Sequence, residues 1–428
     1  MKILIKKASI VDAAVDYPKY SDILVVDGIV TQIGHEIEVE ADKVINGDGL
    51  AALPGFVDMH NHLREPGFEY KETVSSGTKA AARGGYTTIC CMPNTKPVID
   101  NEETLKILLD IINIDAVVNV LPIAAVSIGQ QSQQLTEMKT LKTLGAIAFS
   151  DDGQPVSNNR VMLEALLSAK ENGALIIDHC EDHSLVNGGV INKGSKAQEL
   201  DLVGISNLSE ELPVVRDIML AAEADYKIHI AHVSTRGTVD IIREAKKRGV
   251  KVTCEVTPHH IALSDDMIRA GYTDCKVNPP LRSIEDVQAM KLALKDGTID
   301  TIATDHAPHH ETEKGNDFNK AANGISGIET SFSVCYTELV ETGILSLKEL
   351  VAKMSYNPSQ LLGINKGRVA VGEIADITIV DLNKVNKIDK NTFLSKGKNT
   401  PFHGRSYKGE VVYTIVKGEI IYNREEIK

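Results

Sequence analysis

Two histidines one residue apart, His60 and His62, are the clearest candidates for chemistry in this sequence. They follow the apolar run 56–59, which comes after a Pro54-Gly55 break and is typical of a buried strand. Side chains alternate faces along a strand, so both imidazoles are expected on the same side. Two imidazoles side by side at a strand end make half of a zinc site. The alternative is a hydrogen-bonded core histidine beside an exposed one.

Further imidazoles and carboxylates follow other apolar runs, and they come just beyond the end of each run. They are Asp152, His179, His232 and Asp305. Four histidines and two aspartates suit a pair of divalent metal ions. We predict that His60 and His62 hold one ion with Asp305. His179 and His232 would hold the second ion, and Asp152 would bridge the two.

Two neighbouring cations would depress the pKa of a shared water far enough to give hydroxide near neutral pH. Such a hydroxide attacks a carbonyl carbon that a metal polarises. Asp305 would accept the proton and pass it to the leaving group. The chemistry predicted is hydrolysis of an amide-like bond, or its reverse.

Arg64 gives the clue to the substrate, because it lies just beyond the histidine pair. A guanidinium is a forked donor that fits a carboxylate. Asn94 and Asn278, which also follow strand-like runs, are predicted to hydrogen-bond the same substrate. The alternative for Arg64 is a surface ion pair with Glu65 or Glu69, which would contribute little.

Strand-like and helical patterns alternate through the middle of the chain. The predicted strands are 56–59, 87–92, 117–123, 146–149, 174–177, 228–231, 250–256 and 301–303. Helical segments are predicted between these strands, for example 72–83, 102–112, 160–172, 210–224, 238–248 and 284–295. This alternation indicates an α/β fold with a parallel sheet. Its extent matches a (β/α)₈ barrel of the TIM type, with the candidate residues at the carboxyl ends of the strands. A doubly wound open sheet is the alternative, since local pattern does not reveal closure.

Both ends of the chain have β character. Short strand-like runs occur at 2–5, 22–26 and 30–33, with Asp27-Gly28 as a hairpin turn, and again at 376–381, 411–416 and 420–422. We therefore predict a small β domain built from both chain ends, residues 1–52 and 361–428, with the catalytic barrel, residues 53–360, between them.

Composition excludes several classes of protein. The chain has 428 residues, 43% hydrophobic and 25% charged, which is ordinary for a globular protein. Its net charge of −13, without a Lys/Arg-rich run, argues against a nucleic-acid partner. The sequence has neither a run of about 18 apolar residues nor a signal-peptide pattern, so no membrane association is expected. Its six scattered cysteines are predicted to be buried thiols in a reducing cytoplasm.

Three motifs resemble those of class I dihydroorotase, in the amidohydrolase superfamily. They are the stretch from His60 to Gly67 (HNHLREPG), the stretch 91–95 (CMPNT) and the stretch 305–309 (DHAPH). The resemblance runs over essentially the whole chain. It implies a (β/α)₈ barrel with a small β-sandwich from both termini. It also implies reversible cyclisation of N-carbamoyl-L-aspartate to (S)-dihydroorotate with loss of water, in de novo pyrimidine synthesis.

The resemblance also implies roles for individual residues. The implied zinc ligands are His60, His62, Asp152, His179, His232 and Asp305, with Asp305 as the general acid/base. The implied substrate contacts are His62, Arg64, Asn94, Asn278, His309 and the backbone near Asn323-Gly324. Family members often carry a bulkier apolar residue where Asn323 stands. Many relatives bridge two metals with a carboxylated lysine after strand 4, whereas Asp152 occupies that region here, which implies one or two zinc ions per subunit.

Other functions within and beyond the family are alternatives. A hydantoinase, dihydropyrimidinase or allantoinase acts on substrates without the exocyclic carboxylate, and would not need Arg64 and Asn94 together. A dihydroorotase-like structural partner of aspartate carbamoyltransferase would lack metal ligands, and a mononuclear deaminase would leave Arg64 without a purpose. The resemblance implies a homodimer and leaves room for a complex with the transferase. We further predict that the loop 309–323 closes over the substrate as a lid.

Overall fold

Eight parallel strands surround a common axis in the larger part of the chain, which the computed structural model describes over residues 1–426. The strands are β6 (Phe56–Asn61), β7 (Tyr86–Cys91), β8 (Asn119–Ala124), β9 (Ala148–Phe149), β10 (Ile177–Asp178), β13 (Ile228–Ile230), β14 (Val252–Val256) and β15 (Thr301–Ile302). They pair in this order as two four-stranded sheets. Parallel bridges between Phe149 and Ile176 and between Asn61 and His306 join the sheets at both edges. The closed barrel is therefore confirmed over the open sheet.

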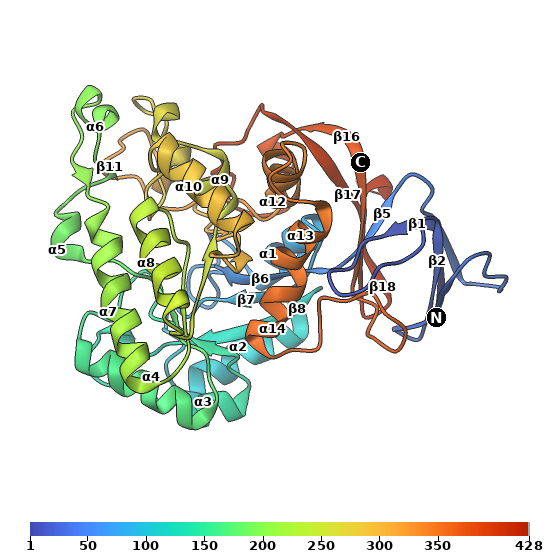
Figure 1. Cartoon of the computed structure of the whole chain (residues 1–428), viewed down its shortest axis with the longest axis horizontal. Helices are drawn as coiled ribbons and strands as arrows, with labels where there is room; N and C mark the ends of the chain where they lie inside the picture. The colour runs from blue at the N-terminus through green and yellow to red at the C-terminus, as the bar shows by residue number, and fades with distance from the viewer. Residues whose placement is uncertain (427–428) are drawn as a thin grey trace.

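Helices cover the outside of the barrel (Figure 1). The main ones are α1 (Val74–Arg83), α2 (Glu102–Asp115), α3 (Met138–Leu144), α4 (Asn159–Asn172), α7 (Leu208–Ala224), α8 (Arg236–Lys247) and α10 (Ile284–Lys295). In α8, Thr235 accepts a hydrogen bond from a main-chain N–H of the first turn, while Val239, Ile242 and Ala245 form the buried face. That face packs in the same apolar cluster as Cys254 of β14. Helix α3 is the main barrel helix for which the sequence patterns gave no bounds.

Shorter elements extend the loops at the carboxyl ends of the strands and complete the last βα unit. They are α5 (His183–Val186), β11 (Ile191–Asn192), α6 (Ser195–Glu199), β12 (Gly204–Ile205), α9 (Pro258–Ala262), α11 (Glu311–Lys314), α12 (Ser331–Cys335), α13 (Leu347–Val351) and α14 (Asn357–Leu362). Two π-helical turns, at Tyr336–Val340 and Ala352–Tyr356, join α12, α13 and α14 into an irregular helical region.

The two ends of the chain build one sheet system beside the barrel (Figure 1). Its strands are β1 (Lys2–Ile10), β2 (Ser21–Val26), β3 (Ile29–Gly34), β4 (Lys43–Asn46), β5 (Ala51–Pro54), β16 (Ile377–Lys387), β17 (Ser406–Val416) and β18 (Glu419–Asn423). Strand β1 pairs with β2 along one edge, with an irregularity between Ile5 and Ala8, and on the other edge it pairs first with β4 and then with β5. Apolar residues from both parts pack into one core. The predicted terminal β domain is confirmed as a fold, and its boundaries at 52/53 and 360/361 stay predictions.

Two local expectations also hold, one for a hairpin turn and one for the cysteines. Asp27 and Gly28 both have positive φ, at 47° and 83°, as the tight hairpin between β2 and β3 requires. All six cysteines are free and buried. Among residues 1–426, no helix combines the length and apolar character needed to cross a bilayer.

Candidate active site and metal centre

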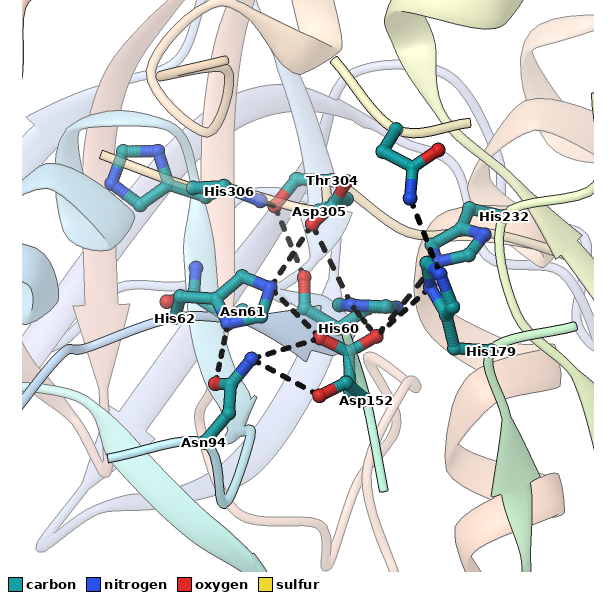
Figure 2. A network of polar contacts seen from close by, with 12 residues as sticks. His60, Asn61, His62, Asn94, Asp152, His179, His232, Thr304, Asp305 and His306 are labelled. Atoms are coloured by element: carbon teal, nitrogen blue, oxygen red, sulfur yellow. Dashed lines mark hydrogen bonds and ion pairs between the residues drawn. The ribbon is translucent and has the colours of Figure 1, made fainter. Parts of the chain in front are cut away.

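The six predicted ligands meet at one rim of the barrel, although they come from five strands or the residues just after them (Figure 2). His60 lies within β6 and His62 directly after it, while the others follow four different strands: Asp152 follows β9, His179 follows β10, His232 follows β13 and Asp305 follows β15. All six are buried. Parallel strands of a closed barrel place their carboxyl ends on the same side, which explains how residues so distant in sequence converge.

One group of candidate ligands consists of His60, His62 and Asp305, whose ligand atoms all lie within 4.8 Å of one another. The Oδ1 atom of Asp305 is 3.1 Å from Nε2 of His62 and 3.5 Å from Nε2 of His60. This is the set predicted to hold the first ion.

A second group shares His60 and adds Asp152 and His232, again within 4.8 Å. Oδ1 of Asp152 is 3.3 Å from Nε2 of His60 and 3.8 Å from Nε2 of His232. His179 adjoins this group, since its Nδ1 is 2.8 Å from Nε2 of His232 and 3.6 Å from Oδ1 of Asp152. The other carboxylate oxygen of Asp152 faces Nε2 of His62 at 3.4 Å, so Asp152 lies between the histidines of both predicted ions.

The chemistry of this cluster fits divalent metal ions. Nε2 of His60 is buried and has no hydrogen-bond partner, and ring nitrogens of His179 and His232 face each other. Neutral imidazoles and carboxylates with inward lone pairs are the ligands that such ions take from proteins. Burial opposes protonation of His60, but Asp152 and Asp305 outweigh it and hold the pKa of His60 above its ordinary value. The field at this point therefore favours positive charge.

Three of the site residues have a left-handed backbone. φ is 62° at Arg64, 29° at His232 and 43° at Asp305. This region is unfavourable for residues with a Cβ, at a cost of order 1–3 kcal/mol each, and such positions cluster at functional sites. The surrounding packing thus holds these side chains in orientations that a relaxed backbone would not give.

A cavity of about 150 Å³ opens beside the metal candidates. Its lining includes five of the six ligands together with Arg64, Asn94, Asn278, Asn323 and Gly324. His309 lies behind this lining, where its Nε2 is 3.2 Å from Nη2 of Arg64 and 2.8 Å from the carbonyl oxygen of Asn323. A larger hollow of about 730 Å³ elsewhere on the surface contains none of the six. The predicted substrate contacts are therefore brought together around one small chamber.

The two asparagines also contact the imidazoles themselves. Oδ1 of Asn94 is 3.0 Å from Nδ1 of His62, and its amide nitrogen donates to Asp152. This places the proton of His62 on Nδ1 and leaves the Nε2 lone pair facing the cluster. Nδ2 of Asn278 is 3.5 Å from Nε2 of His179.

Sequence reasoning missed Glu255, a fully buried glutamate on β14 whose carboxylate contacts His60. Burial opposes its ionisation, but hydrogen bonds from His229 and His60 outweigh burial and lower the pKa of Glu255 to about 2. The signal available was a charged residue inside the apolar run 250–256. A buried charge in a strand needs a partner, and this one has its partners at the site.

The fold and this cluster define a metal-dependent hydrolase of the amidohydrolase type. Solved structures of that class superimpose over the whole chain. An L-hydantoinase (dihydropyrimidinase) from Arthrobacter aurescens matches with a TM-score of 0.89 and 27% identity, covering 100% of this chain and 97% of that one. A D-hydantoinase matches with a TM-score of 0.87 and 25% identity, covering 100% and 96%.

Sequence relatives identify the family to which the chain belongs within this class of hydrolases. A dihydroorotase of Acetivibrio thermocellus is 50% identical over 425 residues, which cover 99% of this chain and 100% of that protein. A dihydroorotase of Ruminiclostridium cellulolyticum is 48% identical over 99% of both. The family model described as dihydro-orotase-like matches residues 49–238. The chain belongs to the dihydroorotase family.

Proposed function

We propose that this enzyme is a zinc-dependent dihydroorotase, which interconverts N-carbamoyl-L-aspartate and (S)-dihydroorotate in pyrimidine synthesis. The observation that carries the proposal is a single small chamber lined both by the candidate ligands and by Arg64. A cyclic amide with an attached carboxylate needs both features, because one part of the site must hydrolyse the amide and another must hold the anion. The relatives named dihydroorotase support the same substrate.

The proposed ligands are His60, His62, Asp152, His179, His232 and Asp305. When bound, zinc lowers the pKa of a water molecule and polarises a carbonyl oxygen. In the ring-opening direction, Asp305 accepts the proton of the attacking water and delivers it to the ring nitrogen as the amide bond breaks. In ring closure, Asp305 takes a proton from the carbamoyl nitrogen and returns it to the departing water. Its carboxylate is ionised, as acceptance of a proton requires, because His60 and His62 outweigh the effect of burial and keep the pKa of Asp305 well below its ordinary value.

Arg64 is proposed to hold the exocyclic carboxylate of the substrate. Its Nε donates to the carbonyl of Pro308 at 3.2 Å and Nη2 approaches His309, which fixes the plane of the guanidinium. A fixed fork loses little further freedom when it binds a carboxylate in two places. Asn278, His309 and the backbone at Asn323-Gly324 are proposed to bind the remaining polar groups of the ring.

Further parts of the proposal are the identity of the metal as zinc, a homodimer, a cytoplasmic location and association with aspartate carbamoyltransferase. The homodimer and the association rest on the family resemblance alone. Zinc is also supported by the histidine and aspartate ligands, and a cytoplasmic location by the six free, buried cysteines. Metal analysis of the purified protein tests the first. Light scattering, with and without the transferase added, tests the assembly.

A substrate panel tests the proposed activity. Purified protein should open the ring of dihydroorotate and show little turnover of hydantoin or dihydrouracil, which lack the carboxylate. The Arg64→Met variant should show a smaller ratio of dihydroorotate turnover to hydantoin turnover. Efficient hydrolysis of hydantoin with no action on dihydroorotate would overturn the proposal in favour of a hydantoinase.

A further inference from the structure

Glu255 connects the interior of the barrel to the metal candidates. Its side chain has no solvent exposure, and its Oε1 lies 2.9 Å from Nδ1 of His60. Its Oε2 lies 3.2 Å from Nε2 of His229, which is also fully buried. The main-chain N–H of His232 also donates to Oε1, at 3.4 Å. One carboxylate therefore contacts the ring of one candidate ligand and the backbone of another.

His229, the second imidazole in contact with Glu255, has a hydrogen-bond partner of its own. Nδ1 of His229 is 2.8 Å from the hydroxyl of Thr253. His229 lies between Ile228 and Ile230, which pack among the helices, so strand alternation turns His229 inward. Thr253 and Glu255 alternate in the same way with Cys254 and Val256 on β14. The result is a chain of contacts Thr253–His229–Glu255–His60 inside the barrel.

The proton positions follow from what each group is able to donate. An ionised carboxylate only accepts hydrogen bonds, so both imidazoles must present N–H groups to Glu255. Nε2–H of His229 then donates to Oε2 of Glu255, and in the neutral ring Nδ1 accepts from the Thr253 hydroxyl, which lies 2.8 Å away. Metal binding requires a neutral His60. With Nδ1–H donating to Oε1, the lone pair of the neutral ring is on Nε2, the buried atom without a hydrogen-bond partner.

We propose that Glu255 is a positioning residue that fixes the tautomer and orientation of His60 for metal binding, with His229 and Thr253 holding the carboxylate in place. This inference rests on the proposed metal dependence and adds a residue that does not touch the substrate. A carboxylate behind a histidine ligand makes the ligand more basic and sets its direction. The negative charge also offsets the positive charge of a bound cation.

Replacement by glutamine separates this role from simple packing. Glu255→Gln keeps the volume, but its NH₂ must face one of the two imidazole N–H groups, because glutamine has only one acceptor oxygen. His60 or His229 must then change tautomer or turn away. The matched control is Glu329→Gln. Glu329 is also a buried carboxylate, paired with Arg83 at 3.1 Å, and among residues 1–426 it contacts none of the six candidate ligands.

The experiment measures zinc affinity by competition with a chromophoric chelator. Thermal unfolding of the metal-free proteins shows whether each variant is folded. Glu255→Gln should weaken zinc binding about 10- to 100-fold. Glu329→Gln should leave zinc affinity unchanged. The Co²⁺-loaded Glu255→Gln protein should also show a shifted visible spectrum, because the ligand field of His60 changes. Should Glu255→Gln not fold, His229→Gln keeps the carboxylate and should show a smaller loss of affinity of the same sign.

Zinc affinity and a cobalt spectrum like those of the wild type in the folded Glu255→Gln protein would overturn the inference. So would equal losses of affinity in Glu255→Gln and Glu329→Gln. Failure of the proposed function looks different. In that case the wild-type protein binds zinc and the variants differ as expected, but dihydroorotate is not turned over.

Discussion

Asp305 contacts both histidines of the HxH pair, and its backbone is in the left-handed region. We expect Asp305→Ala to lower kcat by at least about 10³-fold, because general acid/base catalysis alone contributes 10²–10⁴ and a candidate ligand is lost as well. The variant should remain folded, as judged by circular dichroism. Turnover close to that of the wild type would remove Asp305 from the mechanism.

Arg64 is predicted to act on substrate capture. Loss of a charge-assisted contact of about 1.5–3 kcal/mol should raise KM about 10- to 100-fold in Arg64→Met, with a smaller change in kcat. Arg64→Lys restores the charge without the fork and should recover part of the loss. Steady-state kinetics with dihydroorotate measure both constants. Unchanged KM in Arg64→Met would place the carboxylate elsewhere.

The residues at the site differ in how far the sequence reveals them. The positions of His60, Asp152 and Asp305 after strand-like runs were sufficient to predict that they meet. Glu255 was not predictable in this way, because its contact with His60 spans 195 positions and exists only once the barrel closes. The contact of Asn94 with His62 was also missed for that reason, although Asn94 itself was selected as a substrate contact.

At the scale of elements, the loop after β15 is more firmly built than its composition suggested. It contains α11, and Phe318 packs in an apolar cluster. The buried Lys314 donates from Nζ to the carbonyls of Lys276, Ala322 and Gly324 at 2.9–3.1 Å. Lys314 thus holds the backbone that includes one predicted substrate contact. Closure of the loop as a lid stays a prediction, and protease protection by dihydroorotate would test it.

The burial of Lys314 also predicts how the free energy of unfolding depends on pH. Burial lowers the pKa of Lys314 to about 8, below the value of 10.5 for an exposed lysine. Between these two values the unfolded chain binds a proton that the folded protein does not, so this group raises the free energy of unfolding as pH rises from 8 to 10.5. The full effect is about 3 kcal/mol. Denaturant unfolding gives the free energy of unfolding of wild type and of Lys314→Met at each pH. The difference between the two proteins should change by that amount across this range, and a constant difference would contradict the shifted pKa.

The strand and helix patterns were informative where elements are regular. All eight barrel strands lie at or within a few residues of the predicted runs, because buried parallel strands give apolar runs with helices between them. No bounds were predicted for helix α3, because this helix has only seven residues, of which only Met138 and Leu141 are buried. Helices α12 to α14 were not located either, because π turns interrupt the helical period there.

At the scale of the whole molecule, the candidate ligands connect both halves of the barrel. His60 belongs to the sheet that contains β6–β9, whereas His179 and His232 follow strands of the other sheet. Bound metal should therefore stabilise the whole barrel. With free zinc at about 1,000 times its Kd, the gain is about 4 kcal/mol. Calorimetry should show a lower Tm after chelation and recovery after zinc is added back, whereas an unchanged Tm would show that no metal ties the halves together.

The global architecture was only partly available from sequence. The β character of both ends predicted a joint terminal domain, and pairing of β5 with β16 confirms it. Closure of the barrel was not decidable from local pattern, since it depends on two bridges at Phe149–Ile176 and Asn61–His306. An open sheet would have had the same strand runs.

The central claim is that convergent imidazoles and carboxylates hold metal that makes this chain a cyclic amide hydrolase. The most direct test is ring opening of dihydroorotate by the purified protein, after metal is removed with a chelator and again after stoichiometric zinc is added. We predict loss of turnover in the metal-free protein and its recovery with zinc. Full turnover by protein shown to contain no metal would contradict the account.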